Sequence, residues 1–107
     1  MLPKKNRVDK KTAEKIFKEG WFIGSPNLTL KFLIISGGQK QISFVVPKTV
    51  SKKAVGRNLL RRRGYIALSK HFKNFPAGLR GVFIFKKHQD DVLMLENEIE
   101  RVLSKIN

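Results

Sequence analysis

The chain has 107 residues, of which 23 are Lys or Arg and 8 are Asp or Glu, so its formal net charge is +15. A chain of this length is expected to fold as one domain, residues 1–107, and its 41% hydrophobic residues supply apolar surface for one modest core. The sequence has no cysteine, which excludes disulfides and thiolate metal sites. No apolar run approaches the roughly 20 residues of a membrane-spanning helix, and no signal-peptide pattern follows the basic N-terminus, so we expect a cytoplasmic protein.

The N-terminal part of the chain predicts an arm and a helix. Residues 1–8 form a basic N-terminal arm that we expect to be loosely held. Asp9 or Thr12 can cap a helix that runs to about Glu19 and stops at Gly20.

Two strands follow. Segment 28–34 alternates apolar and polar residues, and so does segment 41–46, with a pair of glycines in the connection between them. This arrangement predicts a hairpin of two antiparallel strands. Segment 21–24 is expected to add a short strand before the first of them.

The second half of the chain predicts a long helix, a strand and a last helix. Ser51 is a candidate cap for a helix over about 52–72, and segment 74–81 is expected to be a loop. The strand 82–86 is apolar on both faces, which predicts a central position in the sheet. An amphipathic helix starts at 90–91. We therefore expect a two-layer α+β domain with the helices against one face of the sheet.

The positive charge is concentrated in one part of the chain. No acidic residue lies between Glu19 and Asp90, whereas fourteen Lys and Arg residues fall in that stretch. A surface that serves only solubility intersperses both signs. The pattern predicts one almost purely positive surface for a polyanionic partner, with the C-terminal helix as the neutral or acidic back.

Segment 47–65, PKTVSKKAVGRNLLRRRGY, carries the densest positive charge. On a helix, Arg57 stacks with Arg61 and Asn58 with Arg62 at a spacing of i, i+4, and Tyr65 extends the same arc. Guanidinium groups bind phosphate oxygens and stack on bases. Like charges at this spacing destabilise an isolated helix, so we expect a bound ligand to compensate for their repulsion. The candidate RNA-binding residues are Lys48, Lys52, Lys53, Arg57, Asn58, Arg61, Arg62 and Tyr65.

The other side of this helix is expected to dock on the sheet. Its apolar residues are Val55, Leu59, Leu60, Ile66 and Ala67. Arg63 falls within this apolar arc, so either its guanidinium must reach out to solvent or Gly64 must loosen the helix.

The same segment resembles the arginine-asparagine signature of the bacterial ribonuclease P protein family. The matching residues are Val46, Lys48, Lys52, Lys53, Ala54, Arg57, Asn58, Arg61 and Arg62. Segment 6–20 resembles the first helix of that family, and the remaining elements follow in the family's order. The resemblance implies a two-layer α-β sandwich of order αβββαβα, ribosomal-protein-S5-domain-2-like, with a left-handed crossover around the arginine-rich helix.

The resemblance also implies a function. The chain would be the non-catalytic protein subunit of a ribonucleoprotein endoribonuclease, itself a monomer when alone, that binds the catalytic RNA and precursor transfer RNA. The enzyme removes the 5′ leader by a Mg²⁺-dependent hydrolysis that the RNA performs, and the Mg²⁺ is held mainly by the RNA and the substrate.

A cleft for the single-stranded leader, between the first helix and the sheet, is a further implication. Its candidate residues are Phe17, Thr29, Lys31 and Ser43. Phe17 matches an aromatic position of the family, whereas Ala13 and Lys31 stand where an aromatic is common. The alternative interpretation of Phe17 is an ordinary core residue beside Ile16.

Other functions fit the sequence less well. Metal-dependent nucleases need clustered carboxylates, and residues 20–89 contain none. His71 and His88 belong to no motif. We therefore expect no catalytic or metal-binding residue in this chain. A structural ribosomal protein or an RNA chaperone shares the size, charge and α+β composition and is the main alternative. Binding of double-stranded DNA ranks third, because a strand and not a helix precedes the basic helix.

Overall fold

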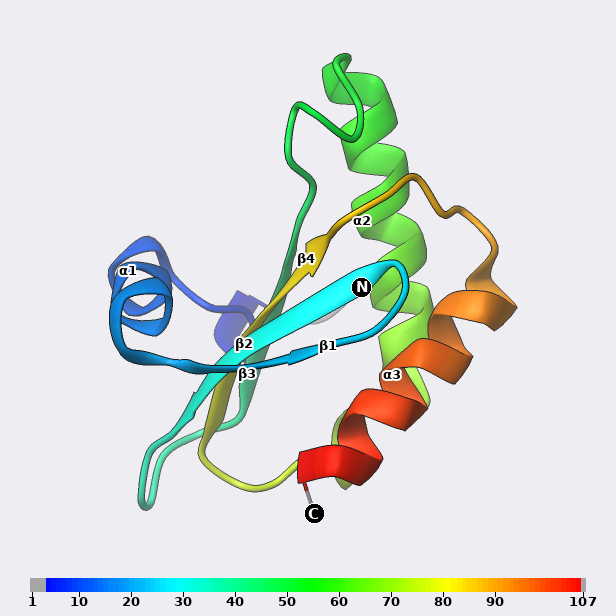
Figure 1. The fold of residues 1–107 in the computed structure, drawn as a ribbon. Coiled ribbons are helices and arrows are strands. Elements are labelled where there is room, and N and C mark those ends of the chain that lie inside the picture. Colours follow the sequence, from blue (N-terminus) through cyan, green and yellow to red (C-terminus); the bar gives the residue numbers. More distant parts are fainter. Residues whose placement is uncertain (1–3, 107) are drawn as a thin grey trace.

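The structure, a computed structural model, describes residues 4–106 and follows the predicted order αβββαβα (Figure 1). Short 3-10 turns, η1 and η2, precede the first helix and follow the second. The elements are η1 (Lys4–Asn6), α1 (Lys10–Glu19), β1 (Trp21–Gly24), β2 (Leu28–Ile34), β3 (Gln41–Val45), α2 (Ala54–Ser69), η2 (Phe72–Asn74), β4 (Leu79–Phe85) and α3 (Val92–Ile106).

The four strands form one sheet in the order β1-β2-β4-β3. Strand β4 is antiparallel to β2 and parallel to β3, so β2 and β3 are not neighbours and the predicted hairpin is wrong. The central position predicted for the apolar strand 82–86 is confirmed, and the strand begins three residues earlier than expected, because Leu79 already pairs with Ile34. A strand with apolar residues on both faces is most stable in the middle of a sheet, where both faces are covered. Strand β4 therefore lies between β2 and β3, and the hairpin of β2 with β3 does not form. The handedness of the β3-α2-β4 crossover stays a prediction.

The helices cover both faces of the sheet (Figure 1). Helices α2 and α3 pack on the face that carries Leu28, Leu30 and Phe32, and the main core lies there. Helix α1 lies on the opposite face, where Ile16 and Val82 are buried outside that core. The expectation that all helices share one face is therefore wrong for α1. The face on which α1 lies carries both polar and apolar residues and forms a surface separate from the main core.

The side through which helix α2 docks matches the predicted one only at Leu60 and Ala67. Val55, Leu59 and Ile66 are exposed, whereas the buried residues are Leu60, Gly64, Tyr65, Ala67 and Leu68. The cause is close packing at Gly64, where a Cβ atom would lie 2.7 Å from ring carbons of Phe44. The residue without a side chain has to face the sheet, and this fixes the rotation of the helix.

Both ends of α2 also differ from the sequence prediction. The amide groups of Val50 and Ser51 donate to the carbonyl of Pro47, so the chain makes a turn before the helix begins at Ala54. Lys53 occupies the capping position without a side-chain cap, and Ser51 does not cap the helix. The helix ends at Ser69 instead of about residue 72, because η2 follows. By contrast, the cap at Asp9 is confirmed: its carboxylate accepts the Thr12 amide at 2.7 Å.

Helix α3 is attached to the β1–β2 turn through a buried carboxylate. Oε1 of Glu98 accepts hydrogen bonds from the Ser25 hydroxyl at 2.5 Å and the Asn27 amide at 2.7 Å, and Oε2 accepts one from Nδ2 of Asn27 at 2.7 Å. Burial by itself raises the pKa of Glu98, but the hydrogen bonds from Ser25 and Asn27 together outweigh burial and lower that pKa. One of the acidic groups of the C-terminal helix is thus structural and contributes little to an acidic outer surface.

Candidate nucleic-acid interface

The first turns of α2 extend beyond the sheet and carry the basic segment (Figure 1). Nη1 of Arg57 donates to the backbone carbonyls of Ser51 at 3.1 Å and Lys52 at 2.7 Å, so this half-buried guanidinium holds the preceding turn against the helix. Lys48, Lys52 and Lys53 are exposed around it. Arg57 therefore has a structural role in addition to its charge, which the helical pattern did not indicate.

Asn58, Arg61 and Arg62 follow on the next turn. Arg61 donates to Oδ1 of Asn58, which leaves the amide NH₂ group of the exposed Asn58 as a donor toward solvent. Arg62 is exposed. Within residues 4–106 the one ion pair joins Lys70 to Glu96 at 3.4 Å, near the other end of α2, so the cations of segment 48–62 have no acidic partner among the described residues. This surface is electrostatically free to bind an anion.

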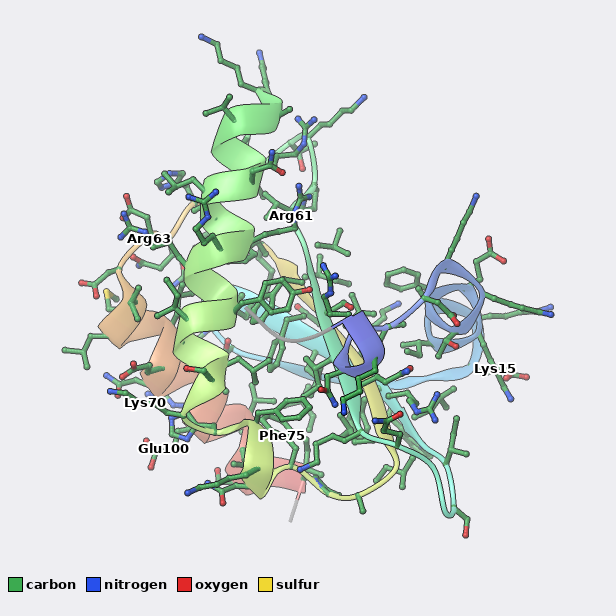
Figure 2. All side chains as sticks on the ribbon, turned by 180° about the vertical axis from the view of Figure 1, so that it is seen from behind. Lys15, Arg61, Arg63, Lys70, Phe75 and Glu100 are labelled. Atoms are coloured by element: carbon green, nitrogen blue, oxygen red, sulfur yellow. The ribbon has the colours of Figure 1, made fainter. Side chains whose placement is uncertain are left out.

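Two residues of the basic segment do not behave as predicted. Tyr65 is 5% exposed, packs edge-on against the ring of Phe44 and accepts the Phe44 amide at 3.2 Å through its hydroxyl. Its ring is therefore unavailable for stacking on a base, and its place in the exposed arc is wrong. Arg63 reaches the loop before α3, where Nη1 donates to the Asp90 carbonyl at 3.1 Å. Figure 2 shows Arg61 and Arg63 on different sides of the helix.

On the opposite face of the sheet, the structure brings Phe17 and Lys31 together. Nζ of Lys31 lies 5.7 Å from the centre of the Phe17 ring, within the range of a cation–π contact. Phe17 is 43% exposed, whereas Ile16 beside it is fully buried, so the interpretation of Phe17 as an ordinary core residue is wrong. Phe22, which the sequence pattern did not indicate, is directly opposite Lys31 in the register of β1 and β2 and is also exposed.

Ser43 has a different environment from the other candidates for the leader cleft. Its hydroxyl accepts the amide of Val8 at 2.7 Å. Nearby, the side chain of Asn6 donates to the Lys40 carbonyl at 3.4 Å, and Gln41 donates to the Lys5 carbonyl at 3.1 Å. The prediction of a loosely held arm is therefore wrong for residues 5–8, which lie along the edge strand β3, while residues 1–3 lie outside the described part.

A cavity of about 430 Å³ separates the beginning of α1 from β3. Its lining includes Lys10, Ala13, Ser43, Val45 and Val82. Ala13 is one helical turn before Phe17, so the cavity and the Phe17–Lys31 pair follow one another along α1. Thr29, the remaining candidate, is half-buried on the same face as Lys31 and does not line the cavity.

The described residues offer no evident protein-held metal centre. Between residues 4 and 106, no three His, Asp or Glu side chains are grouped where they could hold a metal ion. None of the helices described there has the length and apolar character needed to cross a membrane.

Comparisons with known proteins identify the family. The family model described as Ribonuclease P matches residues 2–107. The chain belongs to this family. It is similar in structure to the ribonuclease P protein of Thermotoga maritima, with 21% identity and a TM-score of 0.81 over 94% of this chain and 97% of that one. It is also similar to the ribonuclease P protein of Staphylococcus aureus, with 19% identity and a TM-score of 0.78 over 95% of each chain. A search of curated proteins gave no significant match.

Membership of the ribonuclease P protein family connects the chain with the ribonuclease P complex and with transfer RNA processing. At these identities the solved structures establish the fold, and they agree with the sheet and helix arrangement described above.

Proposed function

We propose that this chain is the protein component of ribonuclease P and binds the catalytic RNA of that enzyme through the N-terminal half of α2. The observation that carries the proposal is the cluster of cations at 48–62, which have no acidic partner among the described residues. Structured RNA presents phosphates that such cations neutralise, and counterion release makes their neutralisation favourable. Asn58 adds a neutral donor that suits a 2′-hydroxyl or a base edge.

The 5′ leader of precursor transfer RNA would lie on the α1 side of the sheet. Phe17 and Phe22 offer exposed rings for stacking, and Lys31, which contacts Phe17 and pairs with Phe22 in the strand register, offers a cation for a phosphate. The protein would thus bind both RNAs on different faces. In this proposal the hydrolysis belongs to the RNA subunit, with Mg²⁺ held mainly by the RNA and the substrate, and the basic protein lowers the Mg²⁺ concentration that the assembled enzyme requires.

A double charge reversal tests the RNA-binding surface. Lys53→Glu with Arg61→Glu changes the charge by four units on the proposed surface, and an acidic residue at the start of a helix is favourable for the fold. The matched control, Arg101→Glu with Lys105→Glu, makes the same change on exposed positions of α3. We expect the first variant to lose association with the catalytic RNA and the stimulation of leader removal at low Mg²⁺, and the control to retain both. Normal association of the first variant would contradict the proposal.

The alternative of a structural ribosomal protein or RNA chaperone has its own test. Crosslinking the protein to RNA in its own cells, followed by sequencing, should recover the ribonuclease P RNA and precursor transfer RNAs. Recovery of mainly ribosomal RNA would favour the alternative.

A further inference from the structure

Helix α2 has a second exposed feature besides its cations. Val55, Asn58, Leu59 and Arg62 line a hollow of about 290 Å³ on the outer side of the helix. Their spacing of i, i+3, i+4 and i+7 places them on one side of the helix, away from the buried residues Leu60, Gly64, Ala67 and Leu68. The helical pattern predicts a core position for Val55 and Leu59, but Val55 is 79% and Leu59 38% exposed.

An exposed apolar floor between polar groups needs an occupant that is apolar on its faces and polar at its edge. A nucleobase has this character. The methyl groups of Val55 and Leu59 can pack against its face, and the Arg62 guanidinium can stack on it or reach its phosphate. Because Oδ1 of Asn58 accepts from Arg61, the Asn58 NH₂ group is left to donate to an acceptor on the edge of the base.

Charge decides between RNA and protein as the source of this occupant. No acidic residue lies between Glu19 and Asp90, and exposed Lys52 and Lys53 lie one turn before the hollow. A polyanion is therefore favoured at this end of α2, and proteins recognise RNA specifically through bases that are free of pairing and stacking.

We propose that the hollow formed by Val55, Asn58, Leu59 and Arg62 binds one unpaired nucleobase of the catalytic RNA. This proposal rests on the proposed function and deepens it. Helix α2 then recognises a particular position in the RNA in addition to its backbone. The apolar and amide contacts supply a part of the affinity that does not depend on salt, whereas the cations supply the part that does.

The test removes the apolar floor without changing any charge. Val55→Ala with Leu59→Ala should weaken binding to the catalytic RNA by about tenfold, because the aliphatic surface that the base would cover is lost, and should leave the slope of affinity against salt unchanged. Asn58→Ala should act in the same direction, again without a change in slope. Arg62→Ala should lower the slope by about one phosphate. Ile66→Ala is the matched control, because Ile66 is 46% exposed one turn beyond the hollow; this variant should bind normally.

Chemical probing of the complex provides a second readout. With the wild-type protein, one unpaired base of the catalytic RNA should be protected at its edge, and the Val55→Ala/Leu59→Ala variant should leave it reactive while the backbone footprint persists. Unchanged affinity and unchanged base protection with this variant would overturn the inference. If Lys53→Glu/Arg61→Glu still abolishes binding in that case, the proposed function stands without it; if the charge reversal also binds normally, both fail.

Discussion

Gly64 of α2 lies directly against the ring of Phe44 in β3, so close that a Cβ atom at Gly64 would be 2.7 Å from two ring carbons. The ring cannot move away easily, because it stacks on Phe83 at 5.1 Å and meets Tyr65 edge-on at 5.0 Å. The contact therefore sets the distance between α2 and the sheet.

Gly64→Ala should destabilise the protein. Overpacking of a core costs about 1–3 kcal/mol, which exceeds the roughly 1 kcal/mol that Ala gains over Gly in a helix. Thermal melting checks this. Gly24→Ala is the control, because a Cβ there meets only the flexible end of Lys86 at 3.3 Å. Equal melting temperatures for the two variants would show that the α2–β3 contact adjusts freely.

Tyr65→Phe should lower stability by about 1 kcal/mol and leave RNA affinity unchanged. The hydroxyl of Tyr65 accepts the Phe44 amide, and its loss leaves that amide without this acceptor. Melting and RNA binding are measured on the same preparation, well below the melting temperature. A loss of affinity without a loss of stability would return Tyr65 to the RNA-binding surface.

Glu98 should make stability depend on acidic pH. Hydrogen bonds lower its pKa in the folded protein below the ordinary value of 4.5. The stabilisation is therefore complete above about pH 4.5 and is lost as the pH falls through the lower folded-state pKa. Glu98→Gln should be less stable than the wild type at pH 7, by about 1–3 kcal/mol, and should lose less stability on acidification. Melting curves between pH 7 and pH 3 measure this, with exposed Glu100→Gln expected to follow the wild type.

Phe17→Ala, Lys31→Ala and Phe22→Ala should each weaken binding of precursor transfer RNA to the assembled enzyme. Loss of one stacking ring costs about 1–3 kcal/mol per base, or roughly 5- to 150-fold in affinity. Mature transfer RNA, which has no leader, should bind normally, and melting temperatures should change little because the two rings are exposed.

Trp21→Ala is the matched control for this set. Trp21 pairs with Phe32, so it faces the α2–α3 side of the sheet, and it is as exposed as Phe22. If Trp21→Ala also reduces precursor binding, or if Phe17→Ala affects both transfer RNAs equally, the leader does not follow the proposed surface.

Local patterns in the sequence predicted the local structure well. The cap at Asp9 and the strands over 21–24 and 28–34 depend on neighbouring residues alone, and the structure confirms them. The sheet order was not predictable in this way, because β3 pairs with a strand that follows after a whole helix. Phe22 was missed for the same reason, since its position beside Lys31 depends on the register of two strands.

The side of α2 that faces the core was predicted only in part. Leu60 and Ala67 are buried as expected. Helical periodicity gives all apolar residues the same weight, so it does not indicate that a glycine must face an aromatic ring. The cationic residues were easier to assign to the surface, because burial of an unpaired charge is costly. The hydrogen-bond partners of these cations within the protein were not predictable. Arg57, for example, contacts backbone carbonyls of the turn before α2, and the sequence did not indicate the geometry of that turn.

The central place of β4 determines when the sheet can form during synthesis of the chain. Strand β3 has no neighbour in the sheet until residues 79–85 have left the ribosome, and the basic helix is synthesised before them. A nascent chain that ends within or soon after α2 therefore carries the full positive segment on an unfinished sheet, without the Phe44–Phe83 stacking that supports it. The sheet is therefore completed late, when the strand that separates β2 from β3 is inserted, and a chain that ends before β4 lacks the layer on which α2 packs.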